Sequence, residues 1–208
     1  MLNASVSVAS VIDFEDFDHG DLITSVTSSD GLLTATVSAV GGANEARIFD
    51  TDQTNTADPD LEADFQNTDG GPTIAPGNAI IIQEAASQAS AIPDDNRSGG
   101  VITIEFSQVV NLLGFTVLDD ADITIRTDKG HFFRHSVDVD RGFAILDLVG
   151  EGITQIQRLE FDFNGASGAF DNLIVTEHVT SVPVPLGGPM LLAGLAMAGF
   201  VLRRKTTG

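Results

Sequence analysis

The chain of 208 residues contains no cysteine, tryptophan or tyrosine, and only 10 of its residues are Lys or Arg. The absence of cysteine excludes a disulfide framework, thiolate catalysis and zinc sites built on Cys. The absence of Trp and Tyr removes the side chains that most often form stacking platforms for sugars. The 30 Asp and Glu residues give a formal net charge of −20. Such a surface repels nucleic acid and attracts divalent cations, so we expect no nucleic-acid partner.

Short stretches rich in Val, Ile, Thr and Phe dominate residues 11–178. Most of them alternate between apolar and polar side chains and are separated by Gly or Asp-Gly turns, a pattern typical of β-strands. Eight or more short strands at this spacing predict an all-β fold, an antiparallel β-sandwich of the jelly-roll type. The clearest strands are expected at 32–40, 78–84, 101–118, 122–128, 131–140, 143–149, 153–163 and 169–177.

Residues 1–10, MLNASVSVAS, are small and weakly apolar. Their SVAS ending is of the small-x-small type that signal peptidases cleave, but the positively charged region and the apolar run of a complete signal peptide are missing. Two interpretations stay open. The segment is either the remnant of a secretory signal whose start lies upstream, or the first strand of the sandwich.

The segment 179–208 contains the one long apolar run. As a helix over about 186–202 it would rise ~26 Å at ~1.5 Å per residue, which is at the short end of what spans a bilayer. The basic cluster Arg203, Arg204 and Lys205 follows at once and predicts a cytoplasmic stop under the positive-inside rule. The alternative is a buried C-terminal helix of the sandwich. The bulky lipid-facing side chains of the span are expected to include Leu186, Leu192, Leu195, Phe200 and Leu202.

The stretch VPVPL, followed by the apolar run and the basic cluster, resembles the PEP-CTERM group of bacterial sorting signals in its VPLPA-CTERM variant. Val182, Pro183 and Pro185 match that pattern, whereas Val184 replaces a Leu and Leu186 replaces an Ala. The resemblance implies export by the secretion machinery, anchoring in the inner membrane with the domain outside the cytoplasm, and recognition by an exosortase. It also implies delivery to the cell surface or extracellular matrix of a bacterium that makes exopolysaccharide.

The segment 50–72, DTDQTNTADPDLEADFQNTDGGP, is the longest irregular stretch between the expected strands. A loop of this length in a compact domain is usually functional or mobile. It is not an EF-hand, because Asn55 occupies the position that needs Gly and Leu61 the position of the bidentate Glu. A looser Ca²⁺ loop and a solvated acidic loop both stay open. The carboxylate ligands expected in a Ca²⁺ loop are Asp50, Asp52, Asp58 and Asp60.

A second acidic pairing involves the two ends of the domain. The expected domain opens with VIDFEDFD at 11–18 and closes with GAFDNLIVTE at 168–177. This arrangement resembles sandwich carbohydrate-binding modules in which an acidic residue of the first strand and an Asp of the last strand share a structural Ca²⁺. The resemblance implies Asp13 or Glu15, together with Asp171, as the ligands. The alternative is that these residues are ordinary outward-facing acids.

Nothing in the domain predicts catalysis. His131 and His135 would be ~13 Å apart on one face of a strand, and no Gly-x-Ser-x-Gly motif is present. We therefore expect a non-enzymatic exported surface or matrix protein. The first alternative is a carbohydrate-binding module for exopolysaccharide, in which Phe65, Phe132 or Phe133 would replace the missing Trp and Tyr. The second is a hydrolase with a carboxylate pair, although 30 acidic residues make any chosen pair uninformative.

Overall fold

A computed structural model describes residues 8–84 and 92–178, all of which belong to one compact unit. These two ranges contain no α-helix; they contain strands and two single-turn 3-10 helices, η1 (Pro59–Leu61) and η2 (Val149–Glu151). The expectation of an all-β fold is confirmed. The strands are β1 (Ala9–Ile12), β2 (Ser25–Thr27), β3 (Thr34–Val40), β4 (Ala46–Asp50), β5 (Gln66–Asn67), β6 (Asn78–Ile82), β7 (Val101–Leu118), β8 (Asp122–Thr127), β9 (Phe132–Ser136), β10 (Gly142–Asp147), β11 (Ile156–Asp162) and β12 (Ala169–Glu177).

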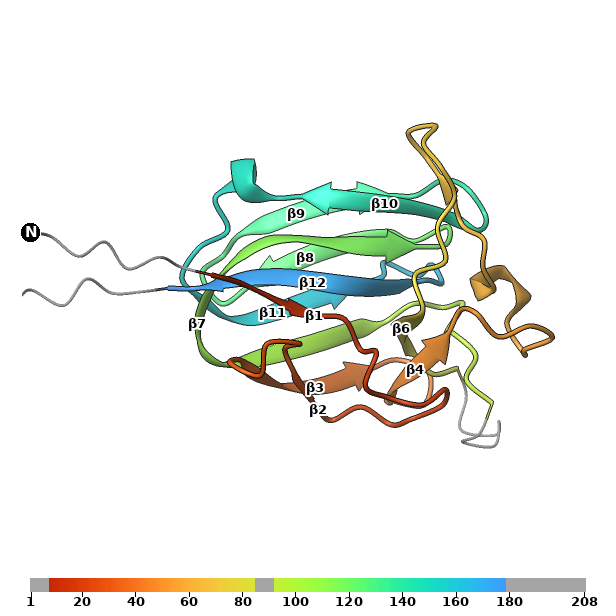
Figure 1. Ribbon diagram of the computed structural model, residues 1–208, viewed down its shortest axis with the longest axis horizontal. Helices are drawn as coiled ribbons and strands as arrows, with labels where there is room; N and C mark the ends of the chain where they lie inside the picture. The colour runs from red at the N-terminus through yellow and green to blue at the C-terminus, as the bar shows by residue number, and fades with distance from the viewer. Residues whose placement is uncertain (1–7, 85–91, 179–208) are drawn as a thin grey trace, which may run out of the picture. The chain divides into compact units, whose positions relative to one another are not determined.

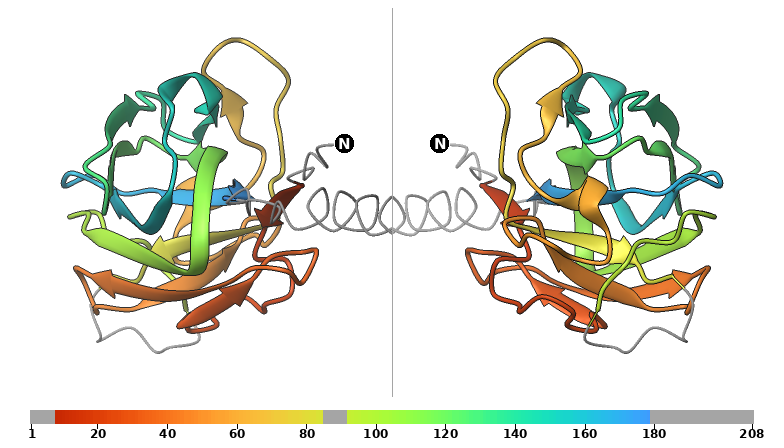
Figure 2. Two further views of the ribbon diagram at one scale, coloured as in Figure 1. Left: turned by 90° about the vertical axis from the view of Figure 1, so that its left-hand side faces the viewer. Right: turned by 90° about the vertical axis from the view of Figure 1, so that its right-hand side faces the viewer.

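Strand β7 organises the sheet, because its two halves pair with different neighbours (Figure 1). Residues 101–105 lie between β3 and β11, whereas residues 114–118 lie between β10 and β12. From β11 the sheet continues through β8 to β9, and from β12 it continues through β6 to β4. Among the described residues every strand pairing is antiparallel except the short one between β5 and β10. The result is a curled, predominantly antiparallel sheet (Figure 2).

The main apolar cluster fills the inside of this curled sheet. It forms because alternate residues of strands such as β3 are buried and exposed in turn, so each strand contributes one apolar face. Phe161 stacks on Phe170 with ring centroids 4.0 Å apart, and Phe115 meets the edge of Phe161 at 5.1 Å. Burial of such large apolar side chains supplies most of the driving force for folding.

A second apolar cluster covers the opposite face of part of the sheet. Successive residues of β6 belong alternately to the main cluster and to this one, so both faces of β6 are buried. The segment 50–72 contributes Leu61 and Phe65 to the second cluster, and both side chains are completely buried. The acidic segment is therefore packed onto the sheet at these residues rather than solvated along its whole length.

Several expectations lie outside the described residues. They include the sorting motif at 182–185, the expected span at 186–202 and the basic cluster at 203–205. Of the segment 1–10, the structure describes only the last three residues, and β1 begins at Ala9. Within 8–84 and 92–178, no helix is long and apolar enough to cross a membrane.

Candidate metal centre

Three aspartates from separate parts of the chain come together at one place. Asp60 belongs to η1, Asp119 follows β7 directly, and Asp140 precedes β10. One carboxylate oxygen from each lies within 4.8 Å of the other two, with Asp119 buried and the other two side chains exposed. This separation is about twice the usual Ca²⁺–oxygen distance of ~2.3–2.6 Å. The spacing therefore suits a hard divalent cation bound between the carboxylates.

Two further aspartates adjoin this group. Asp58 immediately precedes η1, and its carboxylate accepts a hydrogen bond of 3.0 Å from the backbone amide of Asp95. The Asp95 carboxylate in turn accepts a hydrogen bond from the backbone amide of Gly168. Both aspartate side chains are buried. The group of three and these two residues, Asp58 and Asp95, are called the five-aspartate cluster below.

Burial raises the pKa of each buried carboxyl group in the cluster. The pKa of Asp58 rises to about 9 through burial and its contact with the Asp60 carboxyl. The pKa of Asp95 rises to about 7 through burial and the charge of Asp119. The pKa of Asp119 rises to about 6 through burial and the charge of Asp120. The ionised forms are therefore unfavourable in this place unless a cation offsets their charge.

Arg141 holds the backbone around the cluster. Its guanidinium donates hydrogen bonds to the carbonyl oxygens of Glu62 and Ala63, the latter at 2.8 Å. Its backbone amide donates a hydrogen bond of 3.1 Å to Oδ1 of Asp119. One residue thus connects the segment 50–72 to the turn before β10 and to the end of β7. Because Arg141 makes all of these connections, the positions of the clustered carboxylates depend on it.

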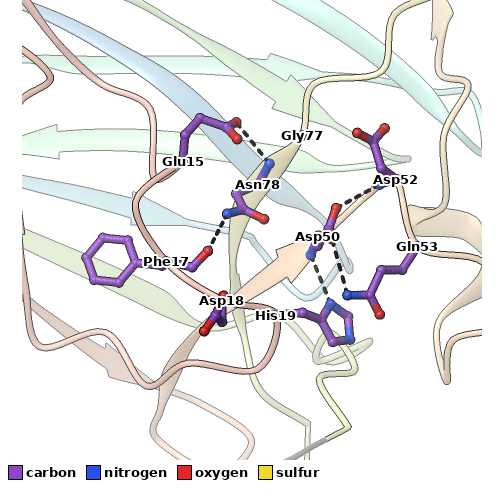
Figure 3. Close-up of a pocket in the computed structure, with 9 residues that line it drawn as sticks. All are labelled: Glu15, Phe17, Asp18, His19, Asp50, Asp52, Gln53, Gly77 and Asn78. Atoms are coloured by element: carbon purple, nitrogen blue, oxygen red, sulfur yellow. Dashed lines mark hydrogen bonds between the residues drawn. The ribbon is translucent and has the colours of Figure 1, made fainter.

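The structure divides the four aspartates expected in the acidic loop between two places. Asp58 and Asp60 belong to the five-aspartate cluster. Asp50 and Asp52 instead line a cavity of about 460 Å³ on another part of the surface (Figure 3). The Asp50 carboxylate accepts hydrogen bonds from the backbone amide of Asp52 at 3.0 Å and from the side-chain amide of Gln53 at 3.2 Å.

The cavity in Figure 3 also contains His19 and Glu15. Nδ1 of His19 accepts a hydrogen bond of 3.0 Å from the backbone amide of Asp50. Burial lowers the pKa of His19, and the Asp50 charge opposes this shift. Burial raises the pKa of Glu15, and the charges of Asp13, Asp50 and Asp52 act in the same direction. The cavity therefore concentrates negative charge around polar side chains.

Asp171, expected from the sequence to share a cation with Asp13 or Glu15, lies in β12 and is completely buried. Burial raises its pKa to about 8, and the charges of Glu15 and Asp13 contribute to this rise. The three acids at the two ends of the domain are therefore within electrostatic reach of one another. They form a group separate from the five-aspartate cluster.

Asp95, Asp119 and Asp140 were not among the ligands expected from the sequence. Each follows a strand or lies in a connection between elements, and the three are far apart along the chain. The pairs of acids at 94–95, 119–120 and 138–140 are the only local signal, and similar pairs are common in so acidic a chain. No spacing rule connects these residues to Asp58 and Asp60.

The phenylalanines expected as sugar platforms have different surroundings. Phe65 is completely buried in the second apolar cluster, so the expectation that it could stack on a sugar is wrong. Phe133 is half-buried against the main cluster. Phe132 is 66% exposed and has the accessibility that stacking on a sugar ring requires.

Comparison with known proteins identifies no family. A scan against models of protein families finds no match to the chain. A search of curated proteins also finds none.

Proposed function

We propose that this chain is a non-enzymatic protein exported to the bacterial cell surface or extracellular matrix, and that Ca²⁺ stabilises its β domain at the five-aspartate cluster. The observation that carries the proposal is the approach of Asp60, Asp119 and Asp140 to within 4.8 Å. In this proposal the curled sheet is a jelly-roll-like sandwich, and the ion joins three of its connections.

Electrostatics favours a bound cation over an empty cluster. Burial, reinforced by the neighbouring like charges, raises the pKa values of Asp58, Asp95 and Asp119 and so disfavours their ionisation. Carboxylate oxygens are the ligands that Ca²⁺ prefers, and extracellular modules commonly bind it with dissociation constants of about 10⁻⁴–10⁻³ M. An exported domain would meet enough Ca²⁺ for such a site to be filled.

The proposed location of the protein is based on the resemblance of its C-terminal segment to bacterial sorting signals. In the proposal, residues 182–185 are the sorting motif that an exosortase recognises, 186–202 anchor the chain in the inner membrane, and 203–205 stay in the cytoplasm. The test is to express the complete reading frame in a host with and without its exosortase. We expect the protein at the surface only when the enzyme is present. Unchanged localisation after replacement of Val182, Pro183 and Pro185 by Ala would contradict the sorting role.

The Ca²⁺ part is tested by thermal unfolding of the full chain in chelator and in millimolar Ca²⁺. A ligand at about 100 times its dissociation constant stabilises by ~2.7 kcal/mol, which corresponds to a rise of about 5–10 °C in Tm for a chain of this size. The double variant Asp60→Asn, Asp140→Asn should lose most of this rise; both residues are exposed, so folding is preserved. Glu151→Gln, an exposed residue of η2 outside the cluster, is the matched control. Identical melting curves in chelator and in Ca²⁺ would refute the proposal.

A carbohydrate-binding module for exopolysaccharide is the second candidate. The cavity in Figure 3 favours it, because Gln53, Asn78 and His19 present polar groups there that could bind hydroxyls. The test is a pull-down of the full chain on the polysaccharide of the host, with Gln53→Ala as the variant. Absence of retention by the wild type would remove this candidate.

A further inference from the structure

Strand β9 ends the sheet with a free outer edge. The sheet runs from β4 to β9, and the two end strands differ in what lies beside them. The segment 20–23 bonds to the outer side of β4, where the backbone amide of Gly20 donates a hydrogen bond of 2.8 Å to the carbonyl oxygen of Ile48. β9 pairs with β8 (Figure 1), and no other part of the described chain is hydrogen-bonded to the backbone of Phe132–Ser136. Such an unpaired edge is a template for a further strand.

The pairing with β8 decides which backbone groups this edge presents. The amide of Val137 donates a hydrogen bond of 2.9 Å to the carbonyl oxygen of Ala121. Opposite residues of an antiparallel pair alternate between hydrogen-bonded and non-hydrogen-bonded positions, so the odd-numbered residues of β9 bond to β8. The even-numbered residues therefore point their amide and carbonyl groups toward the free edge. They are Phe132, Arg134 and Ser136.

The side chains along the free edge suit contact with another protein surface. Successive side chains of a strand point to opposite faces, so Phe132 and Arg134 share the outer face of the sheet. Phe132 is 66% exposed. The guanidinium of Arg134 donates hydrogen bonds to both carboxylate oxygens of Asp122, the one from Nε at 2.9 Å, so its charge is balanced. Aromatic residues and Arg are the side chains that protein interfaces favour.

Charge favours an approach of two copies through the hairpin of β8 and β9. Acidic residues outnumber basic ones by 30 to 10 in the whole chain, so most of the surface of one copy repels the surface of another. Residues 122–136 reverse this balance, because their basic side chains outnumber their acidic ones. The basic residues are Arg126, Lys129 and Arg134, and the acidic ones are Asp122 and Asp128. Contact through this hairpin therefore avoids the repulsion between the acidic surfaces.

A two-fold axis at Phe133 gives a register in which the facing side chains are compatible. Phe132 of each copy then lies opposite Arg134 of the other, and both residues have backbone groups that point to the shared edge. Opposite Cβ atoms in such a pair are about 4.5–5.5 Å apart, which brings the ring within reach of a cation–π contact with the guanidinium. An axis at Arg134 would place two guanidinium groups directly opposite each other, which is destabilising.

We propose that two copies of this chain associate by antiparallel pairing of their β9 strands, which joins the two sheets into one. The edge amides and carbonyls of Phe132 and Arg134 form the hydrogen bonds, and the contacts between these two side chains across the axis fix the register. The interface consists mainly of two five-residue strands, so the dimer belongs to the small and transient class. It depends neither on Ca²⁺ at the five-aspartate cluster nor on the C-terminal segment.

The first experiment is sedimentation equilibrium of the full chain, in chelator and in a density-matched detergent that solvates the apolar run at 186–202. We expect an equilibrium of monomer and dimer between low-micromolar and millimolar concentration. Phe132→Lys places a second cation opposite Arg134 and should weaken the dimer at least tenfold. Adding Arg134→Glu to that variant restores opposite charges across the edge and should recover most of the affinity. Thr36→Lys adds the same charge at an exposed position of β3 and should leave the affinity unchanged. Circular dichroism establishes that each variant is folded.

The second experiment is disulfide cross-linking, which tests the register directly because the chain has no cysteine of its own. Chains with Phe132→Cys and chains with Arg134→Cys are mixed under mild oxidation. Opposite residues in a hydrogen-bonded antiparallel pair have Cα atoms about 5.5 Å apart, within the ~4.4–6.8 Å that a disulfide spans. We expect a disulfide that joins the two different chains, identified by mass spectrometry. Chains with Phe132→Cys and chains with Thr36→Cys should not be joined.

Each result decides the proposal. A wild-type chain that stays monomeric at the highest concentration would overturn it. A dimer that Phe132→Lys does not weaken would contradict it as well, since the association would then use another segment of the chain. Equal cross-linking of Phe132→Cys to Arg134→Cys and to Thr36→Cys would exclude the register. If Phe132→Lys does not fold, the cross-linking of the two cysteine pairs decides.

Discussion

The backbone amide of Asp95 donates a hydrogen bond of 3.0 Å to the carboxylate of Asp58, 37 positions earlier in the chain. Both side chains are buried, and Asp119 is buried beside them. In water these carboxyls would be ionised at neutral pH, but here desolvation and mutual repulsion oppose their ionisation. The stability of this part of the sheet therefore depends on protons or cations.

We expect the metal-free domain to lose stability as pH rises from about 4 to about 9. Burial raises the pKa of Asp119 to about 6, of Asp95 to about 7 and of Asp58 to about 9, whereas an unfolded Asp titrates near ~3.9. In this window the native state binds more protons than the unfolded state, so the free energy of unfolding falls with rising pH. Urea unfolding in chelator at about pH 5, 7 and 9 measures the slope, and saturating Ca²⁺ should flatten it. A free energy of unfolding that increases across the window would contradict the assignment.

Replacement of Arg141 by Lys should destabilise the domain by about 1–3 kcal/mol, because the forked hydrogen bonds to the carbonyls of Glu62 and Ala63 are lost. The same variant should bind Ca²⁺ more weakly, since those bonds hold the segment that carries Asp60. Arg158→Lys is the control, because Arg158 forms exposed ion pairs worth about 0–1 kcal/mol. Denaturant titration measures the free energy of unfolding of both variants. An equal loss of unfolding free energy in the two variants would show that the hydrogen bonds of Arg141 stabilise the domain no more than the exposed ion pairs of Arg158.

Phe65→Ala should cost about 3–5 kcal/mol, the usual penalty for a large aromatic side chain removed from a packed core. Phe65 is completely buried, whereas Phe132 is 66% exposed. Phe132→Ala should therefore change the free energy of unfolding by less than about 0.5 kcal/mol. Chemical unfolding of both variants tests whether the segment 50–72 is part of the folded core. If Phe65→Ala leaves the free energy of unfolding unchanged, the segment 50–72 is not part of the folded core.

Gly77→Ala should destabilise the domain more than Gly70→Ala. Both glycines have a positive φ, 82° and 79°, so the backbone strain of an added Cβ is similar. A Cβ at Gly77 would also lie 2.5 Å from Oε1 of Glu15, whereas one at Gly70 would meet nothing within 4 Å. The difference between the two melting temperatures isolates this contact.

The alternation of side chains was sufficient to predict much of the sheet but not all of it. The range 101–118 coincides with β7, because its Val, Ile, Thr and Phe residues follow a clear period of two over most of its length. Strand β4 (Ala46–Asp50) was not expected. Four consecutive residues of β4 are buried, because this part of the sheet is covered on both faces. When both faces of a strand are buried, its sequence no longer alternates between apolar and polar residues. Only the tertiary structure therefore shows that Ala46–Asp50 is a strand.

The ligand groups were partly foreseeable. Asp58 and Asp60 were expected from the composition of the acidic segment, whereas Asp50 and Asp52, expected with them, line a separate cavity. The expected pairing of Asp171 with Asp13 or Glu15 stays a prediction. The partners Asp95, Asp119 and Asp140 had no signal that distinguished them from the other acids of the chain. Their proximity arises because β7 ends beside η1 and Arg141 connects the two.

The sequence by itself determined the all-β character of the domain and its excess of carboxylates. Both follow from local properties: strand-forming residues at a period of two, and an excess of carboxylates with no cysteine. Only the tertiary structure decided which carboxylates meet. The curled sheet and its connections bring together residues that are distant along the chain, and burial there makes a few carboxylates unfavourable when ionised. The same residue type is thus a solvated surface charge at Asp16 and a candidate ligand at Asp119, because the fold exposes the first and buries the second.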